Sequence, residues 1–174
     1  MGNKKLILPK VPNKNEVLEL FSKAKNIRNK MLLETIYYMG LRVSEAINIK
    51  YEDIDLSEGG FITIRQGKGG RDRLIPIPKT FYNDLNMWLK LQKFNSEDKL
   101  FPISRVQVHN IIKSINPEIH AHSLRHAYGT FLYEKTGDLR AVQEMLGHKN
   151  LETSRIYTHL SKEFKRKIID KAFE

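Results

Sequence analysis

The chain is organised around the run from His120 to Tyr157, HAHSLRHAYGTFLYEKTGDLRAVQEMLGHKNLETSRIY. Its apolar residues recur at helical spacing, which predicts one helix that ends at Gly137 and a second that ends at Gly147. The first buried stripe is Leu124, Ala127, Tyr128, Phe131 and Leu132, and the second is Leu139, Val142, Met145 and Leu146. Arg125 lies off the first stripe, so we expect it to face a polar group.

Four polar residues of this run stand where chemistry could use them. His122 and Arg125 are three positions apart at a helix start and point the same way. His148 follows directly on a helix end, and Tyr157 lies among polar neighbours. Each residue alone has an ordinary explanation, as a structural histidine, a solvated arginine or a packing tyrosine. Their meaning therefore depends on the rest of the chain.

The composition restricts the class of protein. The 174 residues, 40% of them hydrophobic and 29% charged, predict one globular domain, 1–174, with an extended lead-in over 1–12. No apolar run has the length of a membrane span or a secretion signal, so we expect no membrane partner and a cytoplasmic location. The absence of cysteine excludes disulfides, thiolate catalysis and cysteine zinc sites. The net charge of +10 favours a nucleic-acid partner, the alternative being a basic surface with no dedicated partner.

The remaining elements predict a mainly α fold with a small antiparallel β-sheet. Amphipathic patterns predict a helix after Asn13 or Asn15 whose apolar residues include Leu18, a helix over about 28–39, and a helix after Pro78 whose apolar residues include Leu91. A capping box at Ser104 begins another helix, which runs to about residue 115. The runs 61–65 and 72–77 are rich in β-formers and predict a hairpin.

Two basic positions upstream require an explanation. Arg42 follows the expected stop at Gly40 and sits between apolar neighbours, where it needs an anionic partner; Glu45, at i+3, is placed to orient it. Lys68 lies at a glycine-rich hairpin tip that allows close approach of the backbone to a partner, although an ordinary turn lysine is the alternative. The glycine spacing excludes a Walker phosphate loop.

Taken in order, these residues resemble the catalytic set of the tyrosine recombinases, the phage integrase family, in its Xer-like form. The matching residues are Arg42 in Gly40-Leu-Arg-Val-Ser-Glu45, Lys68 in Gly-Lys-Gly-Gly, His122-Ser-Leu-Arg125-His, Leu146-Gly-His148 and Tyr157. No catalytic position departs from the family pattern. The resemblance implies the family's catalytic-domain fold. The helical core-binding domain that usually precedes it in the family is expected to be absent.

The chemistry of strand cleavage gives each residue a role. Attack by Tyr157 on a phosphodiester would form a covalent 3′-phosphotyrosyl link, which stores the bond energy and makes ATP unnecessary. Arg42 and Arg125 would clamp the phosphate, so neither a metal nor another cofactor is expected. Lys68 would protonate the leaving hydroxyl. His122 and His148 would share proton transfer and a phosphate hydrogen bond, and the sequence leaves open which does which. Lys68, Arg71 and Arg73 are expected to contact double-stranded DNA.

Three alternatives compete with a site-specific recombinase. A type IB topoisomerase-like nicking-closing enzyme uses a similar residue set, and a non-catalytic DNA-binding module would keep only the basic surface. A histidine metal site is disfavoured, since His120 and His122 are too close in sequence to share a metal on one helix face.

The tail, 161–174, is expected to form a helix capped by Ser161. Its apolar stripe is Phe164, Ile168, Ile169, Ala172 and Phe173. The stripe either packs onto its own domain or docks into a neighbouring protomer. The family resemblance implies the second arrangement, in tetramers assembled on DNA, with a monomer as the free form.

Overall fold

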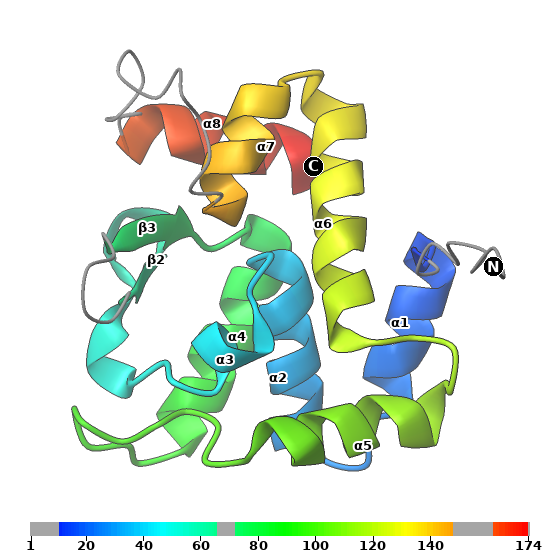
Figure 1. Ribbon diagram of the computed structural model, residues 1–174. Helices are drawn as coiled ribbons and strands as arrows, with labels where there is room; N and C mark the ends of the chain where they lie inside the picture. The colour runs from blue at the N-terminus through cyan, green and yellow to red at the C-terminus, as the bar shows by residue number, and fades with distance from the viewer. Residues whose placement is uncertain (1–10, 66–71, 148–161, 174) are drawn as a thin grey trace, which may run out of the picture.

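The computed structural model describes residues 11–65, 72–147 and 162–173, without the side chains of 162–164. Its helices are α1 (Lys14–Ser22), α2 (Ile27–Tyr38), α3 (Val43–Ala46), α4 (Lys79–Leu91), α5 (Arg105–Ile115), α6 (Ala121–Thr136), α7 (Leu139–Leu146) and α8 (Lys162–Phe173), with 3-10 turns at Tyr51–Asp53 and Ser57–Gly59. The long helix α6 runs past α2 and reaches α5 at one end and α7 at the other (Figure 1). The expected mainly α class is confirmed.

The helix ends follow local chemistry. The Asn13 side chain accepts the backbone N–H of Glu16 at the start of α1, and the Ser104 hydroxyl does the same for Gln107 at the start of α5. Gly137 and Gly147 end α6 and α7 in the left-handed conformation, with φ of 68° and 66°. The predicted caps are therefore confirmed, and Asn13 is chosen over Asn15.

The sheet has three antiparallel strands in the order β1-β2-β3. The expected hairpin is formed by β2 (Phe61–Ile64) and β3 (Arg73–Pro76), with Ile62 opposite Ile75. The strand β1 (Ile54–Asp55) pairs with the other edge of β2 and was not predicted, because two residues are too few to show an alternating pattern. The hairpin tip, with Lys68 and Arg71, lies outside the described residues.

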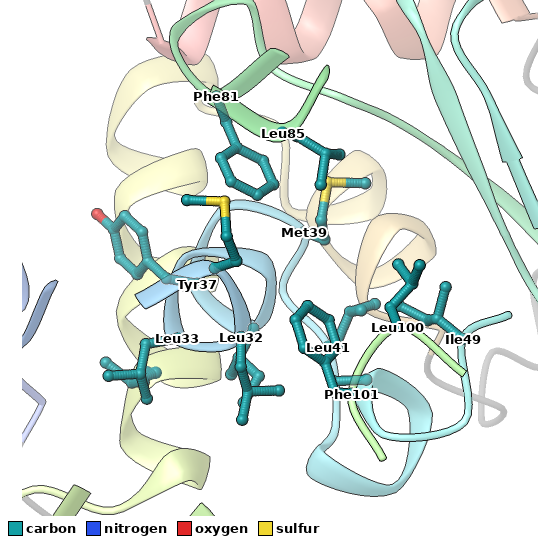
Figure 2. Packing of buried hydrophobic residues seen from close by; sticks show 14 of the residues in the cluster. Leu32, Leu33, Tyr37, Met39, Leu41, Ile49, Phe81, Leu85, Leu100 and Phe101 are labelled. Atoms are coloured by element: carbon teal, nitrogen blue, oxygen red, sulfur yellow. The ribbon is translucent and has the colours of Figure 1, made fainter. Parts of the chain in front are cut away.

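Buried apolar side chains form two clusters joined through α6. The first surrounds α2, where Leu32 and Leu33 are fully buried (Figure 2). Ile36 of the same helix is fully buried as well. The second joins α6, α7 and α8, and α6 supplies Leu124 to the first and Leu132 to the second. Among the described helices, none combines the length and apolar character needed to cross a bilayer.

Three residues assigned to apolar stripes are exposed instead: Leu18, Leu91 and Leu139. Their neighbours Leu20, Leu89 and Ala141 are buried. Other residues of the same stripes, such as Val17, Leu85 and Val142, are buried, so each exposed leucine lies at the margin of a covered face. The facing element, and not the apolar pattern alone, decides how far the covered side of a helix extends. These three assignments were wrong.

Helix α8 packs against α6, α4 and β3 of its own chain. Ile169 is fully buried in the second cluster, and Arg166 donates to the carbonyl oxygens of Gly60 and Ile77. The apolar stripe of α8 therefore packs onto its own domain in this structure, which is one of the two predicted arrangements. The proposed cap Ser161 and the side chain of Phe164 lie outside the described residues.

Candidate active site

The chain turns sharply between α2 and α3, and this turn delivers Arg42. Gly40 adopts a left-handed φ of 59°, and a Cβ there would lie 2.4 Å from the ring of Tyr128 on α6. Only glycine allows this close approach. Leu41 is buried, so the next side chain, Arg42, points away from the core at the N-terminal end of α3.

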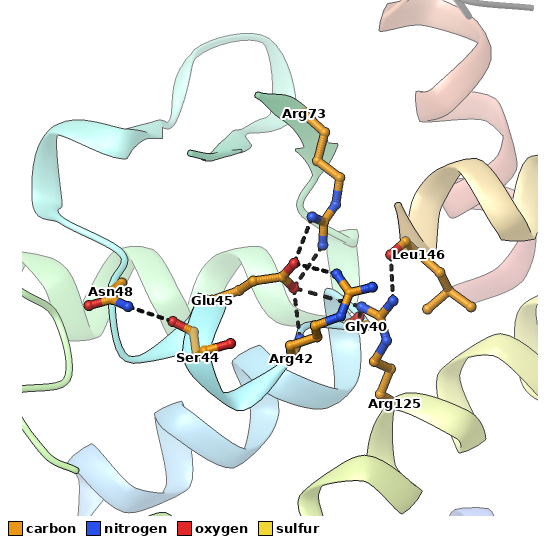
Figure 3. A network of polar contacts seen from close by, with 8 residues as sticks. All are labelled: Gly40, Arg42, Ser44, Glu45, Asn48, Arg73, Arg125 and Leu146. Atoms are coloured by element: carbon orange, nitrogen blue, oxygen red, sulfur yellow. Dashed lines mark hydrogen bonds and ion pairs between the residues drawn. The ribbon is translucent and has the colours of Figure 1, made fainter. Parts of the chain in front are cut away.

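Glu45 lies at the centre of the polar network in Figure 3. Its Oε2 accepts the backbone N–H of Arg42 at 2.8 Å, and its Oε1 accepts Nη1 of the same arginine at 2.9 Å. The Arg42 side chain remains 46% exposed, whereas that of Glu45 is only 12% exposed. The expected contact between these two residues is present, and Arg42 is the accessible cation of the network.

Arg73 occupies a different place from the one expected of a DNA-contacting hairpin residue. Its Nη1 and Nη2 donate to Oε1 and Oε2 of Glu45, both at 2.9 Å, and its side chain is 10% exposed. A guanidinium held by both ends on a carboxylate is not presented to a phosphate backbone. In this arrangement the Arg73 guanidinium is bound to Glu45, and a direct contact of Arg73 with DNA stays a prediction.

Arg125 is buried, and its polar partners come from distant parts of the chain. Nη1 donates to the carbonyl oxygen of Gly40 at 2.6 Å, and Nη2 donates to that of Leu146. Nη1 also lies 3.7 Å from Oε2 of Glu45. Burial, followed by the charge of Arg42, lowers the pKa of Arg125 to about 10. The expected polar surroundings exist, but they lie inside the protein.

The carboxyl group of Glu45 is strongly stabilised as an anion. Burial alone would raise its pKa, but the hydrogen bonds and charge of Arg73, followed by the bonds from Arg42, lower the pKa to about 2. Glu45 is therefore ionised at every pH at which the protein would work.

His122 lies one turn before His126 on α6. The Nε2 atoms of the two rings are 2.9 Å apart, and the rings meet edge to face with centroids at 4.4 Å. Burial, followed by the charges of His126, Arg125 and Arg42, lowers the pKa of His122, which favours the neutral ring that a proton acceptor requires. The role of His126 as a neighbour was missed, although its i+4 spacing from His122 could have indicated it.

A groove of about 440 Å³ opens beside this network, lined by Arg42, Glu45, Asn48, Thr63 and Gly147 among others. The structure thus brings together Arg42, Glu45, Arg73 and Arg125, and the charges of Arg125 and Arg42 contribute to the lowered pKa of His122. Lys68, Arg71, His148 and Tyr157 lie outside the described residues. Within 11–65, 72–147 and 162–173, no group of three or more histidine or acidic side chains is arranged to hold a metal ion.

Two tyrosine recombinases are similar in sequence to this chain over most of its length. Tyrosine recombinase XerA of Pyrococcus horikoshii is 40% identical over 177 residues, covering 95% of this chain and 62% of the relative. Tyrosine recombinase XerC of Yersinia pestis is 37% identical, and the matched region covers 88% of this chain and 56% of the relative. This chain therefore spans about 60% of the length of these curated relatives.

Solved structures share the fold. The crystal structure of XerA recombinase superposes with a TM-score of 0.72 at 27% identity, covering 96% of this chain and 65% of that one. The XerH site-specific recombinase bound to its difH substrate gives a TM-score of 0.65 at 31% identity, and the match covers 88% of this chain and 51% of that one. The model of the Phage integrase family matches residues 10–163. This chain belongs to the phage integrase family.

Proposed function

We propose that this chain is the catalytic domain of a site-specific DNA recombinase, which cleaves and rejoins strands through a covalent 3′-phosphotyrosyl intermediate. The convergence of Arg42 and Arg125 on one carboxylate, next to an open groove, carries the proposal. We infer a single domain because α6 contributes to both apolar clusters. We also propose a cytoplasmic location, where such an enzyme would meet its DNA substrate.

The two arginines suit the binding of a phosphate that gains negative charge. Arg42 is half-exposed at the groove and uses one of its terminal nitrogens on Glu45. Arg125 has five N–H donors, two of which bond carbonyl oxygens. These carbonyls fix the plane of its guanidinium, so its remaining donors are preorganised. Donors set in place before the reaction stabilise the transition state most effectively.

The remaining steps are assigned by the family pattern of the sequence. Tyr157 would attack the phosphorus, and the 5′-hydroxyl would leave with a proton from Lys68. The lowered pKa of His122 supports a role as proton acceptor for Tyr157, which leaves His148 as a donor to the phosphate. Arg42 and Arg125 would hold the non-bridging oxygens throughout. In rejoining, a 5′-hydroxyl displaces Tyr157, so no ATP is consumed.

The relatives favour recombination over the other candidates. XerA and XerC are named tyrosine recombinases, and XerH is a site-specific recombinase solved with its DNA substrate. Strand exchange between two sites distinguishes this activity from a topoisomerase-like one, which only relaxes DNA. A covalent adduct distinguishes it from a non-catalytic binding module.

The first experiment traps the covalent intermediate. The full chain is incubated with a pool of nicked duplexes that have randomised arms, and covalent complexes are recovered from a denaturing gel and sequenced to identify the site. Tyr157→Phe removes only the attacking oxygen and should abolish the adduct while DNA binding persists. Tyr133→Phe, an exposed tyrosine on α6, is the matched control and should form the adduct normally. Adduct formation by Tyr157→Phe would refute the assignment.

We further propose that the protein assembles as a tetramer on DNA by exchanging α8 between protomers, from a free monomer. Because α8 already has a docking surface in its own chain, the same surface of a neighbour could accept it without any new complementarity. Arg166, bonded to Gly60 and Ile77, would then bridge two chains.

A crosslinking experiment separates the two arrangements. Lys79 and Asp170 lie 3.7 Å apart at their charged atoms, and the chain contains no cysteine, so Lys79→Cys with Asp170→Cys gives one addressable pair. A bismaleimide should link the pair within one chain in the free protein and between chains once two DNA sites are paired. Crosslinks that stay within one chain on paired DNA would refute the exchange.

A further inference from the structure

Arg73, the first residue of β3, is enclosed by three separate parts of the chain. Its own strand holds the backbone, and Glu45 of α3 holds both ends of the guanidinium. At the end of α7, a Cβ on Gly147 would lie 3.1 Å from Cδ, Nε and Cζ of Arg73. The backbone at Gly147 therefore packs directly on the arginine, which is more than a surface cation of the hairpin.

Glu45 has three arginine neighbours, but its carboxylate cannot form a bidentate pair, with one N–H on each oxygen, with all of them. Arg42 and Arg73 both donate to it, and Arg125 lies 3.7 Å away. A carboxylate that is free to rotate would form a two-point pair with Arg42 or Arg125, since that geometry is the strongest available. Such a pair would occupy the N–H donors that a phosphate needs.

We propose that Arg73 is a positioning residue for the arginine clamp. Its two-point hold fixes the Glu45 carboxylate, so that Glu45 orients Arg42 through a single side-chain N–H and leaves the other donors of Arg42 to the phosphate. Arg73 acts through Glu45 and does not touch the substrate. This inference rests on the proposed function. A lysine cannot replace Arg73 fully, because its ammonium lacks the fork that matches both carboxylate oxygens.

The test measures the rate of adduct formation in a single turnover, at saturating concentrations of nicked DNA that carries the site recovered from the pool. DNA affinity is measured separately. Arg73→Met should lower the cleavage rate about 100-fold, the loss typical of a displaced catalytic group, while DNA affinity stays within about threefold. Arg73→Lys should recover only part of this rate. Arg28→Met is the matched control: its guanidinium donates twice to Asn29 on α2, and its cleavage rate should equal that of the parent.

A double-mutant cycle provides the readout that a general structural role would not give. If Arg73 acts through Glu45, Arg73→Met combined with Glu45→Gln should cleave no more slowly than Glu45→Gln alone. Urea unfolding shows that each variant is folded, and Arg73→Lys replaces Arg73→Met in the cycle if the latter does not fold.

Three outcomes would overturn the inference while the proposed function stands. The first is cleavage by Arg73→Met at the parental rate. The second is a double variant whose loss of cleavage rate equals the product of the losses of the two single variants. The third is a fall in the DNA affinity of Arg73→Met equal to its fall in cleavage rate, which would make Arg73 a DNA contact. If the parent protein forms no adduct, the proposed function fails and this inference fails with it.

Discussion

Arg125 donates a hydrogen bond from Nη1 to the carbonyl oxygen of Gly40 at 2.6 Å, across 85 positions of sequence. The contact joins the start of α6 to the turn that presents Arg42. The other terminal nitrogen of Arg125, Nη2, donates to the carbonyl oxygen of Leu146, one residue before the glycine that ends α7. One buried guanidinium thus ties together three segments that carry residues of the proposed catalytic set.

The turn at Gly40 should tolerate no side chain. Gly40→Ala combines a left-handed φ with a Cβ 2.4 Å from the Tyr128 ring, so the free energy of unfolding should fall by about 2–4 kcal/mol. Gly137→Ala is the control, because its φ of 68° is similar but nothing lies within 4 Å of the added Cβ; it should lose only about 1 kcal/mol. Urea unfolding measures both, and equal losses would exclude the steric contribution of Tyr128.

The two arginines of the clamp should separate in their effect on stability. Arg42→Ala removes a half-exposed side chain and should change the free energy of unfolding by less than about 1 kcal/mol. Arg125→Ala leaves the carbonyls of Gly40 and Leu146 without their donor and should cost about 2–4 kcal/mol. Both should slow adduct formation about 100-fold or more. Parental cleavage by either variant would contradict its role in the clamp.

Glu45 should contribute to stability in a defined pH range. Its folded-state pKa of about 2 lies below the ordinary 4.5, so its contribution is complete above pH 4.5 and is lost as the pH falls towards 2. Glu45→Gln lacks this dependence. The difference in unfolding free energy between the parent and Glu45→Gln should therefore shrink by on the order of 1–2 kcal/mol between pH 5.5 and pH 3, measured in urea. A constant difference would show that Arg73 and Arg42 do not lower the pKa of Glu45.

Glu34 on α2 should show the opposite dependence. Burial raises its pKa from 4.5 to about 7, with Lys30 opposing the shift and Asp84 adding to it. The stability associated with the protonated form is present below pH 4.5 and is lost as the pH rises through about 7. The neutral Glu34→Gln should therefore be more stable than the parent at pH 8, by on the order of 2 kcal/mol, with a smaller difference at pH 5. A parent that is more stable at pH 8 would contradict the raised pKa.

Features set by neighbouring residues could be predicted from the sequence. Gly137 and Gly147 end helices because a left-handed residue satisfies the last carbonyl groups, and Asn13 and Ser104 begin helices because their side chains bind the N–H groups of the first turn. The contact between Arg42 and Glu45 is equally local, since the two residues are three positions apart at a helix start.

Features set by distant residues were decided only by the tertiary structure. No local pattern indicates that Arg73 is held by Glu45, 28 positions earlier, or that the partners of Arg125 are the carbonyls of two helix ends. The same holds for α8: its apolar stripe required burial, but only the packing of α6, α4 and β3 provides the surface that buries it in this chain. A sequence specifies which groups need a partner through their charge and apolar area, whereas the identity of the partner depends on which segments the folded chain places side by side.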